Sequence, residues 1–451
     1  MIRNVLCHIL IATLTLSCNS GEELYGTTTV TKWQHNKEGA VSITYDDGTI
    51  NQFRIARPLM NERGLPGTFY IPTGALPNSQ HKGKFVGRSV EEIIAETAEE
   101  PTSEDNFFER ASAVRYLGYE DVHKYHREAG SLYEQGNVNQ AYEVIDEAYR
   151  KVRKGVFEKK DRSWSYPLSP YVYSVIVVEP GGNLLTWDDL KSYNTDFHEF
   201  ASHTVTHPYL AVLDEANMMY ELKTSKSAIR KHLGKEHTFS AELPFGTKDP
   251  RVMKYGHKVY PALRNRMPEP YLTEIPRGSE INPDTTSTEY TLWQRGPLSD
   301  TPMQKMKSWV DQTQSNDNTW LVLVFHGIEG IGWEPVSEDE ITEYFDYISK
   351  RTDDLWVATY ADGTKYVRER MNADVSSEWD GDEITVRLNH TLGSRYELPL
   401  TLKTRVPSAW SSVRIQQGKQ TQVVSPKAEA GMSYVIYQAR PNAQPVEINA
   451  R

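Results

Sequence analysis

Two adjacent carboxylates at the end of a short strand-like run are the residues best suited to chemistry. Asp46 and Asp47 follow the β-prone run 41–45 and precede Gly48, a pattern typical of a strand that ends in a turn. Because side chains alternate along a strand, the two carboxylates should face different ways. One can then face a metal ion while the other faces a substrate or a water molecule. An isolated Asp-Asp-Gly is more often an ordinary turn, so further residues must support this interpretation.

Three histidines supply that support. His203 and His207 lie four residues apart in the stretch 200–208, and His326 follows the apolar run 322–325. Each stands where a strand or helix would end. One aspartate and two histidines make a three-ligand divalent site that leaves coordination positions open for water and substrate.

These motifs resemble the polysaccharide deacetylase family, also called the NodB-homology domain or carbohydrate esterase family 4. The family's first motif reads Thr-Phe-Asp-Asp-Gly, and residues 44–48 read Thr-Tyr-Asp-Asp-Gly. Its second motif, His-Ser/Thr-x-x-His, is matched by residues 203–207. The similarity extends over roughly 40–75 and 180–370. The two motifs in this order are a specific signal, whereas either alone would be weaker.

The resemblance implies a metal centre. Asp47, His203 and His207 would hold a divalent cation, for which zinc is the default with this ligand set and nickel and cobalt are the competitors.

The resemblance also implies roles for three further residues. Asp46 would act as the general base that takes a proton from water, and His326 as the general acid that protonates the leaving group. The backbone N–H of Phe245, which follows Pro244 as in the family's third motif, would help to hold the oxyanion. The sequence names no further substrate-binding residue.

Two family features are missing from the sequence. The third motif usually carries an arginine that pairs with the base, but Ala241 and Glu242 stand in that region. Arg264 or Arg266 is a candidate replacement. The fourth motif, Asp-x-Trp, has no clear match, because Trp293 has no aspartate two residues before it. These departures leave the reaction class standing and put the substrate in question.

Composition narrows the class of protein. The chain of 451 residues is 38% hydrophobic, enough to bury a sizeable core. Its formal net charge of −11 and the lack of a Lys/Arg cluster argue against a nucleic-acid partner.

The N-terminus reads as a targeting segment. Residues 1–18 carry Arg3 and then a mostly apolar run that is too short for a transmembrane helix. Residues 14–18 resemble a bacterial lipobox, which would make Cys18 the lipidated N-terminus of a periplasmic or cell-surface lipoprotein; a plain secretory signal is the alternative. Cys7 and Cys18 are the only cysteines, so the mature fold has neither a disulfide nor a cysteine zinc site within it.

The remaining sequence patterns divide the chain into domains. Strand and helix patterns alternate over 39–372, which predicts a mostly parallel sheet with helices outside, and the resemblance implies a distorted (β/α) barrel. Four helical patterns at about 76–170 predict an insertion that either shapes one rim of the site or is a structural ornament. Residues 19–38 are a linker or an edge strand. Short alternating runs over 374–451 predict a small β-sandwich, which could bind glycan through Trp379 or Trp410 or simply pack on the catalytic domain.

The expected function is therefore a metal-dependent hydrolase that removes acetyl groups, N-acetyl before O-acetyl, from an extracytoplasmic polysaccharide or oligosaccharide. Two alternatives stay open. One is an O-acetyl esterase that acts on a plant or algal glycan. The other is a glycan-binding surface lipoprotein whose deacetylase site is impaired, which the missing arginine would favour.

Overall fold

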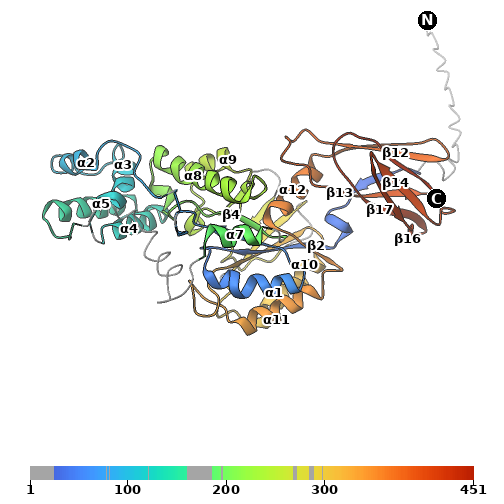
Figure 1. Ribbon diagram of the computed structural model, residues 1–451, viewed down its shortest axis with the longest axis horizontal. Helices are drawn as coiled ribbons and strands as arrows, with labels where there is room; N and C mark the ends of the chain where they lie inside the picture. Colours follow the sequence, from blue (N-terminus) through green and yellow to red (C-terminus); the bar gives the residue numbers. More distant parts are fainter. Residues whose placement is uncertain are drawn as a thin grey trace, which may run out of the picture. The chain divides into compact units, whose positions relative to one another are not determined.

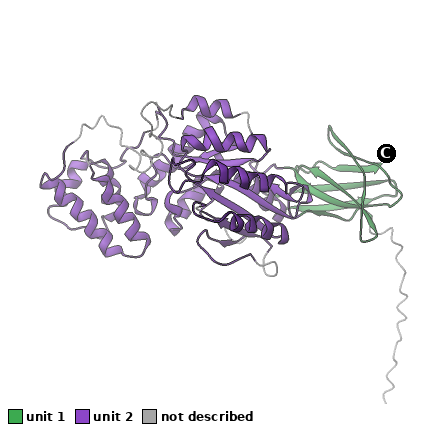
Figure 2. Cartoon of the chain, turned by 90° about the horizontal axis from the view of Figure 1, so that it is seen from below, with its two compact units in different colours: residues 1–31, 373–391, 399–451 green, residues 32–372, 392–398 purple. Residues whose placement is uncertain are grey.

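The computed structural model describes residues 25–451 apart from 78, 81, 120, 160–184, 195–196, 268–271, 284–288 and 297. The targeting segment 1–18, with Cys18, and a strand predicted over 171–178 lie outside the described residues. The chain forms two units, one of residues 32–372 and 392–398, the other of residues 1–31, 373–391 and 399–451 (Figure 2). No helix in the described part of the chain has the length and apolar character needed to cross a bilayer.

The larger unit is built on a sheet in which every described strand pair is parallel. The strands follow the order β6-β5-β4-β3-β2-β9-β8-β7, and β10 pairs with β2. Their bounds are β2 Gly39–Tyr45, β3 Gly67–Ile71, β4 Glu199–Ser202, β5 Ser240–Ala241, β6 Ala262–Leu263, β7 Thr273–Ile275, β8 Thr291–Arg295, β9 Thr319–Phe325 and β10 Leu355–Val357. The sheet curls into a half-barrel, so the predicted fold class is confirmed.

The two central strands, β2 and β9, show that the sheet is covered on both faces. Every residue of β2 and β9 is buried, and both read as nearly continuous apolar and β-branched runs, as parallel strands between helices do. The ring of Tyr45 on β2 stacks on Phe69 of β3 and Phe325 of β9, with centroids 4.7 and 5.2 Å apart. The strand that ends in the two aspartates is therefore fixed on both sides by aromatic packing.

Helices follow the strands as the sequence predicts (Figure 1). Thr186 is the N-cap of the helix Trp187–Tyr193 and forms a capping box with Asp189. After β2, a π-helical turn, Gln52–Ala56, leads directly into α1. The helices of this unit outside the insertion are α1 Arg57–Glu62, α7 Trp187–Tyr193, α8 Glu215–Leu233, α9 Pro250–Val259, α10 Met303–Ser315, α11 Glu338–Ser349 and α12 Tyr360–Met371.

The strand before the candidate oxyanion residue is very short. It consists only of β5, and residues Pro244–Gly246 form a short 3-10 turn. Proline has no N–H to donate to a neighbouring strand, and Phe245 adopts a left-handed backbone with φ of 64°. The chain therefore leaves the sheet at this point and turns across its edge.

The insertion between β3 and β4 is helical, as predicted. Its described elements are α2 Val90–Glu96, α3 Phe107–Ala113, a 3-10 turn Val114–Tyr116, α4 His123–Glu134 and α5 Val138–Arg153. They share an apolar core that includes Phe107, Ile145 and Tyr149. Val212, a few residues after the motif that contains His203 and His207, belongs to the same core. The insertion is thereby packed against the segment that carries the candidate metal ligands.

The smaller unit consists of two antiparallel sheets, with the orders β1-β13-β17-β16 and β11-β12-β18-β14-β15. β1 lies at the edge of its sheet and pairs with β13. The rings of Trp379 and Trp410 lie 5.7 Å apart, edge to face. The strands are β1 Thr28–Val30, β11 Asp374–Trp379, β12 Glu383–Asn389, β13 Leu400–Val406, β14 Val413–Gln417, β15 Gln420–Val424, β16 Lys427–Glu429, β17 Met432–Ala439 and β18 Val446–Ala450.

Candidate metal centre and active site

The candidate functional residues lie at one edge of the parallel sheet. Parallel strands place all their carboxyl ends on the same side, which is where (β/α) barrels carry their active sites. Each of the following residues stands directly or within two positions after a strand: Asp46 and Asp47 after β2, His203 after β4, Glu242 after β5, Arg264 after β6 and His326 after β9. The fold therefore gathers residues that are up to 280 positions apart in the sequence.

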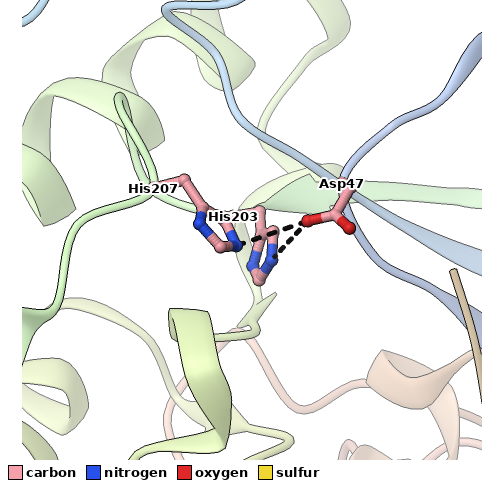
Figure 3. Close-up of side chains that lie close together, drawn as sticks. All are labelled: Asp47, His203 and His207. Carbon is pink, nitrogen blue, oxygen red and sulfur yellow. Dashed lines mark ion pairs between the residues drawn. The ribbon is translucent and has the colours of Figure 1, made fainter. Parts of the chain in front are cut away.

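Asp47, His203 and His207 form the only group in the described part of the chain whose ligand atoms could hold a metal ion, all within 4.8 Å of one another. The Asp47 Oδ1 atom lies 3.6 Å from Nε2 of His203 and 3.3 Å from Nε2 of His207 (Figure 3). All three side chains are buried. The backbones of Asp47 and His207 are left-handed, with φ of 71° and 54°. Such strained backbone is concentrated at functional sites, where the surrounding structure holds it in place.

The donor set fits a divalent cation. His203 Nδ1 lies 2.9 Å from the carbonyl oxygen of Glu242 and must carry a proton to bond there, so Nε2 is the nitrogen that faces the Asp47 carboxylate. A cation between these two groups would replace the proton that His203 otherwise donates to Asp47. Donors about 2.0–2.1 Å from a shared ion in tetrahedral geometry are roughly 3.3–3.4 Å apart. The two measured distances lie close to this value.

The charges of the triad also suit a cation. Burial alone would raise the pKa of Asp47, but hydrogen bonds from His203 and His207 hold it below its ordinary value. Burial would lower the pKa of His203, yet the hydrogen bond to Asp47 raises it. Burial dominates for His207, whose pKa is lowered. An ionised carboxylate beside imidazole nitrogens is the state in which these residues act as ligands.

A buried glutamate fixes the loop between the two histidines. Glu221 on α8 accepts hydrogen bonds at Oε2 from the backbone N–H groups of Val205 and Thr206, both 2.8 Å long, and at Oε1 from the Thr206 hydroxyl. Hydrogen bonds to a carboxylate are stronger than neutral ones. The histidine pair therefore lies on a rigid loop rather than on a helix face, and its spacing is set by Glu221.

Asp46 points away from the triad, as strand alternation predicted. Its Oδ2 atom lies 2.5 Å from Nη2 of Arg264 and 3.3 Å from Nε2 of His326. Burial alone would raise the pKa of Asp46, but the positive charge of Arg264 and the contact with His326 outweigh it and hold the pKa well below its usual range. Asp46 is thus ionised and hydrogen-bonded at the pH values where a general base must accept a proton.

Arg264, one of the two candidates to replace the missing arginine, pairs with Asp46. It also lies 3.2 Å from Oε1 of Glu242 and donates a 2.7 Å hydrogen bond to the Thr44 hydroxyl. One buried guanidinium therefore contacts two buried carboxylates. Burial raises the pKa of Glu242, so Asp46 is the carboxylate that Arg264 keeps ionised. Arg266, the other candidate, has no described contact with Asp46.

A tryptophan that the sequence did not indicate contacts His326. Trp333, in the loop after β9, stands edge-on to the ring of His326, with centroids 4.7 Å apart. Trp293, the residue nearest to the fourth motif in sequence, is buried in β8 beneath the guanidinium of Arg295.

Phe245 joins the insertion to the metal centre. Its ring contacts His207 edge to face at 4.8 Å and stacks on Tyr209 at 3.7 Å. The N–H of Tyr209 donates a 3.1 Å hydrogen bond to Nε2 of His126 on α4. The Cβ and ring of Tyr209 pass so close to Gly130 that a Cβ atom there would lie 2.3–2.5 Å from them. The insertion thus fixes Tyr209, which in turn supports the turn whose backbone is the candidate oxyanion donor.

All predicted site residues line one cavity of about 350 Å³. It is a size that suits a sugar unit of a longer chain. The lining residues are Asp46, Asp47, Arg127, His203, His207, Tyr209, Glu242, Phe245, Gly246, Arg277, His326 and Trp333.

Comparison with known families agrees with the motifs. Residues 171–259 match the family model described as polysaccharide deacetylase. The matched segment is a minor part of the chain. It includes His203, His207 and Phe245, whereas Asp46 and His326 lie outside it. Polysaccharide deacetylases are hydrolases that act on amide or ester bonds.

Among curated proteins, a gellan lyase from a Bacillus species is 24% identical in an alignment 321 residues long, which covers 65% of this chain and 12% of the lyase. The chain therefore spans only a small part of that relative.

Several solved deacetylase structures are distantly similar. A candidate polysaccharide deacetylase from Mycobacterium smegmatis is 12% identical with a TM-score of 0.36, and the match covers 77% of this chain and 96% of that one. The Xyl-CE4 domain of a xylanase from the hindgut metagenome of Trinervitermes trinervoides is 10% identical with a TM-score of 0.29, covering 72% and 88%. A peptidoglycan N-acetylglucosamine deacetylase is 10% identical with a TM-score of 0.30, covering 75% and 89%.

Sequence reasoning missed several residues of this candidate site. Glu242 was noted only as a departure from the third motif, yet it is bonded to Arg264 and its carbonyl orients His203. No sequence pattern marks Arg127 or Tyr209 as a site residue, because Arg127 lies in the insertion and Tyr209 packs against it. Trp333 has a weak sequence signal, since it is an aromatic residue in a glycine-rich loop seven positions after His326.

Proposed function

We propose that this protein is a metal-dependent deacetylase that removes acetyl groups, with N-acetyl groups as the first candidates, from a polysaccharide or oligosaccharide. The proposal rests on one observation, which is that two sets of residues line the same cavity. Asp47 with His203 and His207 can hold a divalent cation, and beside them Asp46 with His326 can move protons. Zinc is the proposed metal.

A bound divalent cation would polarise the substrate carbonyl and lower the pKa of water. Asp46, kept ionised by Arg264, accepts the proton of the attacking water. His326 lies 3.3 Å from Asp46 and donates a proton to the departing amine nitrogen as the carbon–nitrogen bond breaks. The backbone N–H of Phe245 is the proposed donor to the oxyanion. Water is consumed, and acetate and a free amine are released.

The structure weakens the alternative of an impaired glycan-binding protein. That alternative depended on the missing arginine of the third motif, and Arg264 reaches Asp46 from a different strand. An O-acetyl esterase would use the same residues, with an alcohol in place of the amine as the leaving group. Substrate assays, rather than the site geometry, separate these two reactions.

The central test is acetate release by zinc-loaded protein from chitin hexamer, peptidoglycan and acetylated xylan. Asp46→Asn should lower kcat by about 10²–10⁴-fold while zinc stays bound, because the base is not a ligand. Asp339→Asn, an exposed aspartate on α11, is the matched control and should retain full activity. Wild-type protein that binds zinc but releases acetate from none of these substrates would refute the proposed function.

The metal is tested separately. Treatment with a chelator should abolish acetate release, and zinc, nickel and cobalt should be compared for its recovery. Metal analysis of the purified protein then identifies the native ion. His203→Ala and His207→Ala should each lose the metal, whereas His126→Ala should not.

We also propose export from a bacterial cell, with a lipid on Cys18. The proposal is supported by the sequence of residues 1–18 alone. Radiolabelled palmitate should be incorporated into the wild-type protein and not into Cys18→Ala. Equal labelling of both proteins would contradict it.

A further inference from the structure

Two arginines on the cavity wall have no part in the proposed hydrolysis. Arg277 and Arg127 both line the cavity that contains the metal triad and Asp46. We infer that they bind an anionic group of the substrate, so that the natural substrate is an acetylated acidic glycan with carboxylate or sulfate groups. This inference rests on the proposed deacetylase function and names the chemical class of its substrate.

Arg277 is held beside the oxyanion turn. It lies in the loop after β7, and a Cβ atom on Gly246 would be 3.2 Å from its Nη2 atom. Its Nη1 atom is buried and has no hydrogen-bond partner in the described part of the chain. A buried guanidinium nitrogen without an acceptor is costly unless a ligand supplies one. This atom therefore marks where an acidic group could bind.

Arg127 approaches from the insertion. It is an exposed residue of α4, and among the described residues it forms no ion pair with a carboxylate. An exposed arginine alone is usually just a solvated charge. What distinguishes Arg127 is that it shares a cavity with Arg277, although 150 positions separate them in sequence.

The carboxylates on the cavity wall have closer partners than these arginines, and Glu242 is the one that also feels the charge of Arg277. Asp46 and Glu242 share Arg264, and Asp47 faces the metal position. With a divalent cation bound, the acidic and basic groups at the base of the cavity cancel. Arg127 and Arg277 then add two positive charges, although the whole chain carries a formal net charge of −11. A neutral glycan would use neither charge, whereas an acidic one would pair with them.

Arginine also suits this chemistry in its shape. Its planar guanidinium presents paired N–H donors that match the two oxygens of a carboxylate or sulfate. A carboxylate on the sugar next to the acetylated one would give such a pair of oxygens. The same forks would bind a sulfate ester, so the test must include both groups.

The test compares oligosaccharides that differ in charge. Zinc-loaded protein is titrated calorimetrically with chitin hexamer, hyaluronan hexamer and 6-O-sulfated chitin hexamer at 50 and 300 mM NaCl. We expect the preferred anionic hexamer to bind at least roughly 10-fold more tightly than the neutral one, because hydrogen bonds to charged groups are the strong ones. The preference should fall at high salt. The carboxylate and sulfate probes show which group is recognised.

Variants identify the residues. Arg277→Met and Arg127→Met should each reduce the preference for the anionic hexamer while affinity for chitin hexamer is unchanged, and the double variant should abolish it. Arg150→Met is the matched control, because Arg150 is an exposed arginine of α5 outside the cavity lining. Equal affinity for charged and neutral hexamers, including undetectable binding of all of them, would overturn the inference, as would a preference that persists in the double variant.

Acetate release in the same samples separates the two claims. Release from chitin hexamer without any charge preference rejects the anionic substrate and leaves the deacetylase proposal standing. Charge-selective binding that depends on both arginines, with no acetate release from any hexamer, rejects the deacetylase proposal and retains the anionic binding site.

Discussion

Replacement of Arg264 is the most direct test of how the general base is kept ionised. Its side chain is 1% exposed and contacts the carboxylates of Asp46 and Glu242 at 2.5 and 3.2 Å. Two unit charges about 4 Å apart interact by about 4 kcal/mol at the effective dielectric constant of about 20 that suits protein sites. Because this interaction favours the ionised carboxylate, Arg264→Met should raise the pKa of Asp46.

The pH profile of kcat/KM makes this shift visible. Asp46 must be ionised to accept a proton, so its pKa sets the acidic limb of the profile. Loss of Arg264 moves that limb to higher pH, and the ratio of wild-type to variant activity should be larger at pH 5 than at pH 8. Arg264→Lys keeps the charge but loses the paired donors, so its limb should lie between the other two.

A second buried arginine serves as the control. Arg295 is 5% exposed and donates to the carbonyl oxygens of Gln294 and Ile281 rather than to a carboxylate. Arg295→Met should therefore destabilise the fold without moving the acidic limb. Breaking the Arg264 pair should itself cost about 3–5 kcal/mol of folding stability. A folded, zinc-loaded Arg264→Met protein whose acidic limb matches that of the wild type would refute the electrostatic argument.

Three further changes test the supporting structure. The Glu221 carboxylate accepts hydrogen bonds from two loop N–H groups, and Glu221→Gln puts an amide, which is partly a donor, in its place. Zinc affinity, measured by competition with a chelator, should therefore fall roughly 10–100-fold. Unchanged affinity would show that the loop keeps its conformation without Glu221. Gly130→Ala places a Cβ atom 2.3 Å from the Tyr209 ring and should lower kcat and cost about 1–3 kcal/mol in stability, measured by acetate release and urea denaturation. Burial raises the pKa of Glu369 from 4.5 to about 8, so folding stability should fall by at most roughly 1.4 kcal/mol for each pH unit between these values. Glu369→Gln should flatten that dependence in denaturation midpoints measured at pH 5.5 and 7.5, and a slope equal to that of the wild type would contradict the assignment.

The sequence predicted the parts of the site that follow strands in a fixed order. Asp46, His203 and His326 each directly follow a strand, and the sheet places those strand ends together because its strands are parallel. The helix starting after Thr186 was also predictable, since its capping box consists of neighbouring residues. Local patterns of this kind need no knowledge of distant contacts.

Residues that reach the site from elsewhere could not be found in this way. Glu221 lies in α8 among several acidic and basic residues, and nothing in its local sequence marks it as the acceptor for the histidine loop. Arg264 could be named only as one of two candidates, because the side chain that reaches Asp46 depends on the register of the two-residue strand β6. Such contacts are properties of the tertiary structure.

The place of the insertion in the topology explains why it borders the site. A parallel strand delivers the chain at its carboxyl end, so a segment that follows β3 must start at the edge where the site residues lie. The first residues after β3 are already bonded to the histidine loop, with Thr73 N–H donating to Thr204 and Gly74 N–H to Val205 at 3.0 and 2.8 Å. The metal ligands and the base come from the sheet edge, whereas Arg127 comes from the insertion. If the proposed function holds, changes in the insertion should alter which glycan is bound while the residues proposed for hydrolysis stay in place.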